Sequence, residues 1–158
     1  MDPFEERARK RLEAIDDLDV EAFSASFLLF RLATQYLGYL ESTVHRPRGL
    51  STAGFRVLFT VWVYDELEPR QIARLSGVST AAVSGVLGTL ESKGLVVKQR
   101  DTTDRRLVRV RLSQEGADLL TETYAEQNRA EHNMFDGVAE LDAFSDRMRS
   151  LLRLLNER

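Results

Sequence analysis

The densest group of side chains able to bind an anion lies in the segment RDTTDRRLVRVRLS, residues 100–113. Six basic and two acidic residues between positions 98 and 111 give this region a local charge of +4. Arginine side chains present several N–H donors to phosphates and base edges, and Asp101 and Asp104 can hold neighbouring guanidinium groups by charge-assisted hydrogen bonds. This chemistry is binding of a polyanion, and it requires no catalytic group.

The same region predicts a β-hairpin. The runs LVVKQR and LVRVRL are rich in β-branched residues and are joined by a turn at DTTD. In the second run apolar residues alternate with Arg109 and Arg111, which predicts a strand with one buried face and one arginine face.

A helix-turn-helix is predicted directly before the hairpin, in RQIARLSGVSTAAVSGVLGTLESKGLV, residues 70–96. Ala73 is small enough for two helices to cross there, and Gly77 can adopt the positive φ that the turn needs. Ser79 is a good N-cap for the second helix. Helical spacing then places Val83, Val86, Leu87 and Leu90 inside and leaves an exposed side of Thr80, Ala81, Ser84, Gly85 and Gly88.

A helix-turn-helix followed by a hairpin is the pattern of a winged helix that binds double-stranded DNA. A wing-tip arginine, Arg105 or Arg106, can enter the minor groove, whereas Arg100, Arg109 and Arg111 suit phosphates. We expect Arg105 to reach DNA and Arg106 to pair with Asp101, with the reverse assignment open; the Asp/Arg pairs could also serve only the turn. The predicted DNA-binding residues are Ser79, Thr80, Ala81, Ser84, Arg100, Arg105, Arg106 and Arg109.

Long helices are predicted on both sides of this unit. Residues 19–44 form one, Ser51 caps another that ends near Asp65, and helices at about 113–135 and 138–156 complete the chain. The predicted fold is mainly α with a small β-hairpin wing: a winged helix-turn-helix with long N- and C-terminal dimerisation helices. We expect one compact unit with an N-terminal helical region (1–48), a DNA-binding lobe (49–112) and C-terminal helices (113–158). The apolar faces of 20–40 and 141–155 exceed what the lobe can cover, which predicts a homodimer.

The chain resembles the MarR family of bacterial transcriptional regulators over nearly its whole length. The resemblance rests on LSTAGFRVLF, on LESKGLV, and on RDTTDRRLVRVRLSQEGADLL across the wing and the following helix. It implies a homodimeric, ligand-responsive repressor on a palindromic operator, with a small aromatic or anionic effector bound between the dimer helices and the DNA-binding lobe. The chain departs from the family in one respect, since its recognition helix has no basic residue between Arg74 and Lys93.

For an effector, the sequence offers aromatic side chains together with cations around the end of the first long helix and in the next one. The candidates are Tyr36, Tyr39, His45, Arg56 and Trp62, and the alternative is that the aromatic residues belong to the core or to a dimer contact. No cofactor, metal site or enzymatic activity is expected, because the chain has no cysteine, two distant histidines and no catalytic motif. We expect a cytoplasmic protein without a membrane span.

Charge is divided along the chain in a way that fits a DNA-binding centre. Residues 46–111 contain twelve basic and six acidic residues, a net +6, and the flanks contain ten and nineteen, a net −9. A second function stays open: a winged-helix dimer that binds a small ligand or a protein partner without sequence-specific DNA binding. The uncharged recognition helix favours that alternative, and the arginine-rich wing disfavours it.

Overall fold

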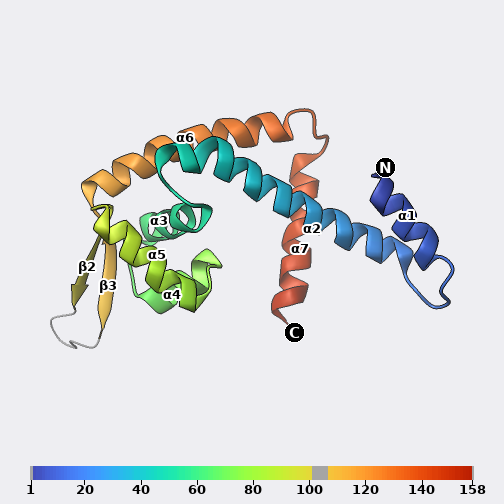
Figure 1. Cartoon of the computed structure of the whole chain (residues 1–158), viewed down its shortest axis with the longest axis horizontal. Coiled ribbons are helices and arrows are strands. Elements are labelled where there is room, and N and C mark those ends of the chain that lie inside the picture. Colours follow the sequence, from blue (N-terminus) through green and yellow to red (C-terminus); the bar gives the residue numbers. More distant parts are fainter. Residues whose placement is uncertain (1, 101–106, 158) are drawn as a thin grey trace.

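The structure is a computed structural model that describes residues 2–100 and 107–157. Two helices, α1 (Pro3–Leu12) and α2 (Val20–Leu40), lead through a π-helical turn and a short 3-10 turn to the first helix of the lobe. The remaining elements are α3 (Thr52–Tyr64), β1 (Glu66–Leu67), α4 (Pro69–Ser76), α5 (Thr80–Ser92), β2 (Val96–Arg100), β3 (Val108–Leu112), α6 (Gln114–Phe135) and α7 (Leu141–Asn156). The winged helix, α3 to β3, lies at one end of the molecule, and α2 and α6 extend from it (Figure 1).

Serine caps determine where three helices begin. The Oγ atoms of Ser51, Ser79 and Ser113 accept hydrogen bonds from the backbone N–H of the third residue of α3, α5 and α6, at 3.0, 3.2 and 2.9 Å. Each bond satisfies an N–H group that has no partner within its helix. The helix starts expected at Ser51, Ser79 and Ser113 are thereby confirmed.

The sheet has three antiparallel strands in the order β1-β3-β2. Val96 pairs with Leu112 and Arg100 with Val108. The predicted hairpin and the alternation of its second strand are therefore confirmed. β1 pairs with β3 through Glu66 and Leu67. β1 was not predicted, because two residues are too few to show a period of two.

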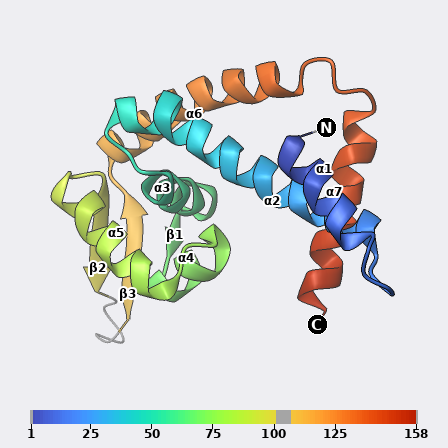
Figure 2. The same ribbon diagram turned by 45° about the vertical axis from the view of Figure 1, so that its right-hand side comes forward.

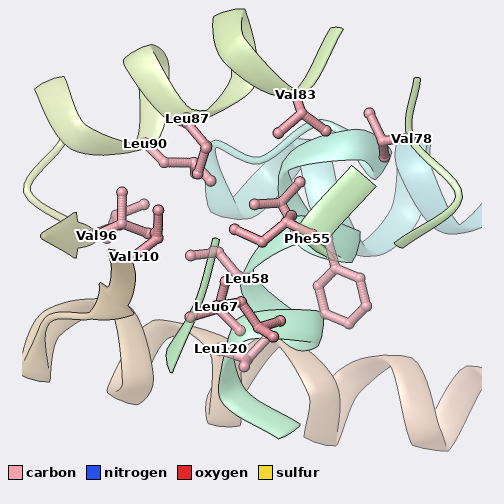
Figure 3. Packing of buried hydrophobic residues seen from close by; sticks show 14 of the residues in the cluster. Phe55, Leu58, Leu67, Val78, Val83, Leu87, Leu90, Val96, Val110 and Leu120 are labelled. Carbon is pink, nitrogen blue, oxygen red and sulfur yellow. The ribbon is translucent and has the colours of Figure 1, made fainter. Parts of the chain in front are cut away.

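The core lies where α3, α5, the sheet and the first half of α6 meet (Figure 3). Leu58 of α3, Leu87 of α5 and Val110 of β3 are at most 2% exposed, and Leu120 of α6 is 1% exposed. Because burying one such side chain contributes about 1.5–3 kcal/mol, this cluster holds the recognition helix and the wing on one frame.

The junction between α2 and the lobe differs from the continuous helix expected over residues 19–44. The α-helix ends at Leu40, and Glu41–His45 form a π-helical turn before Pro47. Arg48 ties this junction to α6 by ion pairs with Glu122, at 2.7 Å, and with Glu126. The hydrogen-bonded guanidinium of Arg48 lowers the pKa of Glu126.

The helix α1, at Pro3–Leu12, was not predicted from the sequence.

Large apolar side chains are exposed on α2 and α7. Phe30 of α2 is 71% exposed, Leu155 of α7 is 68% exposed, and no residue of α7 is buried. The same kind of exposure recurs at Leu28, Leu29, Leu32, Leu151, Leu152 and Leu154. α7 lies away from the winged helix in two views, and α2 extends away from it from the end at Leu40 (Figures 1 and 2). Within the described ranges, no helix combines the length and the apolar character that crossing a membrane requires.

Candidate nucleic-acid interface

The recognition helix α5 presents the face that the sequence predicted. Val83 is 1% exposed and Leu87 and Leu90 are each 2% exposed, and these residues face the core. The opposite side consists of exposed residues, including Ser79 at the cap and Thr80, Ala81, Ser84, Gly85 and Gly88 along the helix. This surface is small, uncharged and able to approach a groove floor closely, where methyl and hydroxyl groups can contact bases.

The turn that orients α5 has the expected geometry. Ala73 of α4 is 8% exposed at the helix crossing, and Gly77 has φ +65°. The Ser76 side chain accepts a hydrogen bond from the N–H of Val78 at 3.2 Å. Glycine adopts this left-handed conformation without the strain that a Cβ introduces, which explains its place in the turn.

Two of the described wing arginines, Arg109 and Arg111, share one exposed face of the hairpin, whereas Arg100 pairs with Val108 and therefore lies on the opposite face. Arg100 lies at the end of β2, and Arg109 and Arg111 lie on β3. Glu66 of β1 pairs with both of the latter, at 3.1 Å to Arg109 Nη1 and 3.7 Å to Arg111 Nε. Glu66 was not among the predicted site residues, since its role depends on strand pairing with a segment 43 positions away.

These wing ion pairs are exposed and therefore weak, about 0–1 kcal/mol each. A DNA phosphate can compete with Glu66 for the same guanidinium groups. Asp101, Asp104, Arg105 and Arg106 fall outside the described residues, so their predicted roles stay predictions.

The effector candidates Tyr36 and Tyr39 line one cavity of about 360 Å³ between α2 and the end of α6. The Tyr36 hydroxyl donates to Glu131 Oε1 at 3.3 Å. Burial, together with the adjacent Glu131 carboxylate, raises the pKa of Tyr36 to about 12. The other lining residues are Leu32, Gln35, Ala130, Asn133 and Met134.

Trp62 lies in a separate and smaller hollow of about 80 Å³ on the side of α3 that faces α6. Its ring is 6.0 Å from that of Phe59, and the Phe59 ring is 5.3 Å from that of Tyr124. Leu120 and Thr121 complete the hollow. Three aromatic rings thus form one half-exposed cluster.

His45 is 1% exposed and belongs to the junction rather than to a cavity. Its ring stacks on Phe55 at 4.4 Å, and its Nε2 lies 2.8 Å from Gln127 Oε1. Nδ1 lies 3.4 Å from the Thr52 hydroxyl. His45 is therefore part of the packed junction between α2, α3 and α6.

The five effector candidates therefore do not share one cavity in the described chain. Arg56 extends to the α4–α5 turn, where its guanidinium carbon would be 3.6 Å from a Cβ on Gly77. Arg56 and Trp62 are six positions apart on α3, so they point to different sides of that helix. The positions of Arg56 and Trp62 in the sequence do not by themselves show that the two side chains lie at different sites.

No group of histidine, cysteine and carboxylate side chains suited to a metal occurs in the described part of the chain.

Known proteins with similar sequences and structures are regulators of transcription. Residues 50–108 match the model of the MarR family. The HTH-type transcriptional regulator YwaE of Bacillus subtilis is 38% identical over 124 residues, which cover 78% of this chain and 72% of that protein. Such relatives are regulators and not enzymes.

Two solved structures show the same fold over most of the chain. CouR of Rhodococcus jostii RHA1, solved with p-coumaroyl-CoA bound, is 28% identical with a TM-score of 0.73, covering 83% of this chain and 90% of that chain. A MarR-family regulator of Rhodococcus sp. RHA1 is 26% identical with a TM-score of 0.72, covering 85% and 93%. The predicted fold class, mainly helical with a winged helix-turn-helix, is confirmed.

Proposed function

Because this chain belongs to the MarR family of transcriptional regulators, we propose that it is a ligand-responsive repressor that binds a palindromic operator as a homodimer in the cytoplasm. The observation that carries this proposal is the exposed, uncharged face of α5 beside an arginine-bearing hairpin. A helix of this kind enters the major groove while the wing contacts the backbone or the minor groove.

The proposed homodimer is supported by the exposed apolar side chains of α2 and α7. Leaving several leucines and a phenylalanine of α2 and α7 in water is unfavourable by about 25 cal/mol for each Å² of apolar surface, so we expect a second copy of the chain to cover them. In such a dimer the two recognition helices would lie about 34 Å apart, one turn of B-DNA.

The proposed effector response uses the aromatic surfaces near the junction of α2, α3 and α6. Tyr36 and Tyr39 line the larger cavity, and Trp62 lies in the aromatic hollow, so both are candidate sites for a planar ligand. CouR, with its bound p-coumaroyl-CoA, is a relative whose ligand combines an aromatic group with anionic charge. Filling either site could change the separation of the two recognition helices and therefore the fit to both half-sites.

The test is selection of bound duplexes from a random DNA pool by the purified protein near physiological salt. We expect an inverted repeat whose half-sites are about ten base pairs apart. Recovery of no motif, with weak and salt-sensitive binding alone, would reject the operator and favour the alternative function. That alternative, a dimer that binds a small ligand or a protein partner, is motivated by the absence of basic residues between Arg74 and Lys93.

Base contacts from α5 are tested by Thr80→Val. The side chain of Thr80 is exposed in the first turn and has no charge. We expect the substitution to change the preferred bases of the selected site, at a cost of about 1–3 kcal/mol for the original site, while the salt dependence stays the same. Competition binding against the selected duplex and its single-base variants measures this effect.

Thr43→Val is the matched control for that experiment, since Thr43 is exposed in the turn after α2 and its hydroxyl donates to the Tyr39 carbonyl at 2.7 Å. It should leave base preference unchanged. Identical preferences for the Thr80→Val protein and this control would show that the start of α5 does not contact bases.

A further inference from the structure

Arg56 lies on the second turn of α3, and its side chain crosses to the turn between α4 and α5. A Cβ on Gly77 would be closer to Arg56 Nη2 than van der Waals contact allows, and 3.6 Å from Arg56 Cζ. The guanidinium group therefore rests directly on the backbone of Gly77. The φ of +65° favours glycine at this position, and a Cβ there would also displace the end of the Arg56 side chain.

The guanidinium of Arg56 makes no hydrogen bond or ion pair with any residue in the ranges 2–100 and 107–157. Among the described cations of the lobe, Lys98 pairs with Glu91 at 2.7 Å and Lys93 donates to the Gly49 carbonyl at 2.6 Å, whereas Arg70, Arg74 and Arg100 have no such partner within the same ranges. Those three arginines are exposed, and Arg56 differs from them because it is partly buried. Arginine keeps its charge in proteins, and a partly buried charge without a partner is unfavourable. An anion arriving at this turn would remove that cost.

The Arg56 charge lies next to the start of the recognition helix. Gly77 is two residues before Ser79 and three before Thr80, where the exposed face of α5 begins. That face has no basic side chain of its own. A recognition helix in the major groove is bordered by phosphates on both sides, and proteins obtain most of their sequence-independent affinity by neutralising such phosphates.

We propose that Arg56 binds a phosphate of the DNA backbone beside the first turn of α5, and so supplies from α3 the positive charge that the recognition helix lacks. The inference rests on the proposed function, and it assigns Arg56 to the DNA interface instead of the effector site. A phosphate contact contributes affinity for all sequences and no base preference. Arg56 thus complements Thr80 and Ser84, which are uncharged.

The test is equilibrium binding of the full-length protein to a labelled mixed-sequence duplex of about 30 base pairs, long enough for two half-sites a helical turn apart. Binding is measured from about 50 to about 200 mM salt. For Arg56→Gln we expect the slope of log K against log salt to become smaller by about two, one phosphate for each subunit of the proposed dimer, and affinity near 0.1 M salt to fall about five- to tenfold for each subunit engaged. Arg56→Lys, which keeps the charge, should retain the slope of the unmodified protein.

Arg11→Gln is the matched control, because Arg11 is exposed on α1, far along the chain from the lobe, and the substitution removes the same charge. If thermal melting shows that Arg56→Gln is unfolded, Arg56→Met replaces it, because methionine preserves the apolar stem that packs over the turn. Equal slopes and affinities for the neutral Arg56 variant and Arg11→Gln would overturn the inference while the proposed function stands. Absence of salt-dependent DNA binding by the unmodified protein would instead overturn the proposed function and this inference together.

Discussion

Gly116→Ala is expected to destabilise the protein by about 3 kcal/mol, although alanine normally stabilises a helix relative to glycine. Gly116 is buried in the first turn of α6, where the chain that enters β2 passes directly over it. A Cβ at this position would overlap the carbonyl oxygen of Leu95 and come within 2.9 Å of its carbonyl carbon. Both are backbone atoms, so no side-chain rotation can relieve the overlap.

Two hydrogen bonds from Ser113 hold the start of α6 close to the chain that precedes β2. The Ser113 hydroxyl donates to the Gly94 carbonyl at 2.6 Å, and the Ser113 N–H donates to the Leu95 carbonyl at 3.1 Å. Moving α6 away to admit a methyl group would break these bonds and shift β2 relative to α5. Urea unfolding followed by circular dichroism measures the loss.

Gly85→Ala and Gly88→Ala are the matched controls for this prediction. Both glycines lie in the interior of α5, on its outer side, and a Cβ at either would have no neighbouring atom within 4 Å. Each substitution should stabilise the protein by about 0.8–1 kcal/mol through helix propensity alone. A Gly116→Ala protein as stable as these controls would contradict the close approach of α6 to Leu95.

Leu152→Glu combined with Leu155→Glu is expected to convert the proposed dimer into a monomer and to weaken operator binding about 10²- to 10⁴-fold. The two side chains lie on the same face of α7 and are 60% and 68% exposed, so their charges cost the single chain little. If α7 forms part of the contact between the two copies, the glutamate charges would be buried there without partners. Each monomer would then engage one half-site and lose the effective concentration that a second linked lobe provides.

Light scattering coupled to size-exclusion chromatography measures the mass, and titration with the selected operator measures the affinity. The control, Arg147→Gln with Ser150→Glu, changes the net charge of α7 by the same amount at polar positions of the same helix. It should remain dimeric. Retention of the dimer by the double glutamate variant would show that α7 is not part of the contact between copies.

The local elements of this protein could be predicted because their signals are close together in the chain. A serine cap and the helical period that follows it lie within a few residues, and so do the alternating residues of β3 and the glycine of the α4–α5 turn. The exposed face of α5 follows from the same periodicity, since one side of the helix must cover the core. These features are sufficient to define a winged helix and its candidate DNA-facing surface.

Contacts between distant segments were decided only by the tertiary structure. Three of these contacts join different elements: Glu66 pairs with the wing arginines, His45 packs against Phe55 and Gln127, and Arg56 reaches Gly77. Tyr36 and Trp62, in contrast, lie in separate hollows. Periodicity indicates which side of a helix is buried, but it does not indicate which neighbour covers that side. That choice depends on how the elements pack in three dimensions, and it moved Arg56 from an expected ligand site to the edge of the recognition helix.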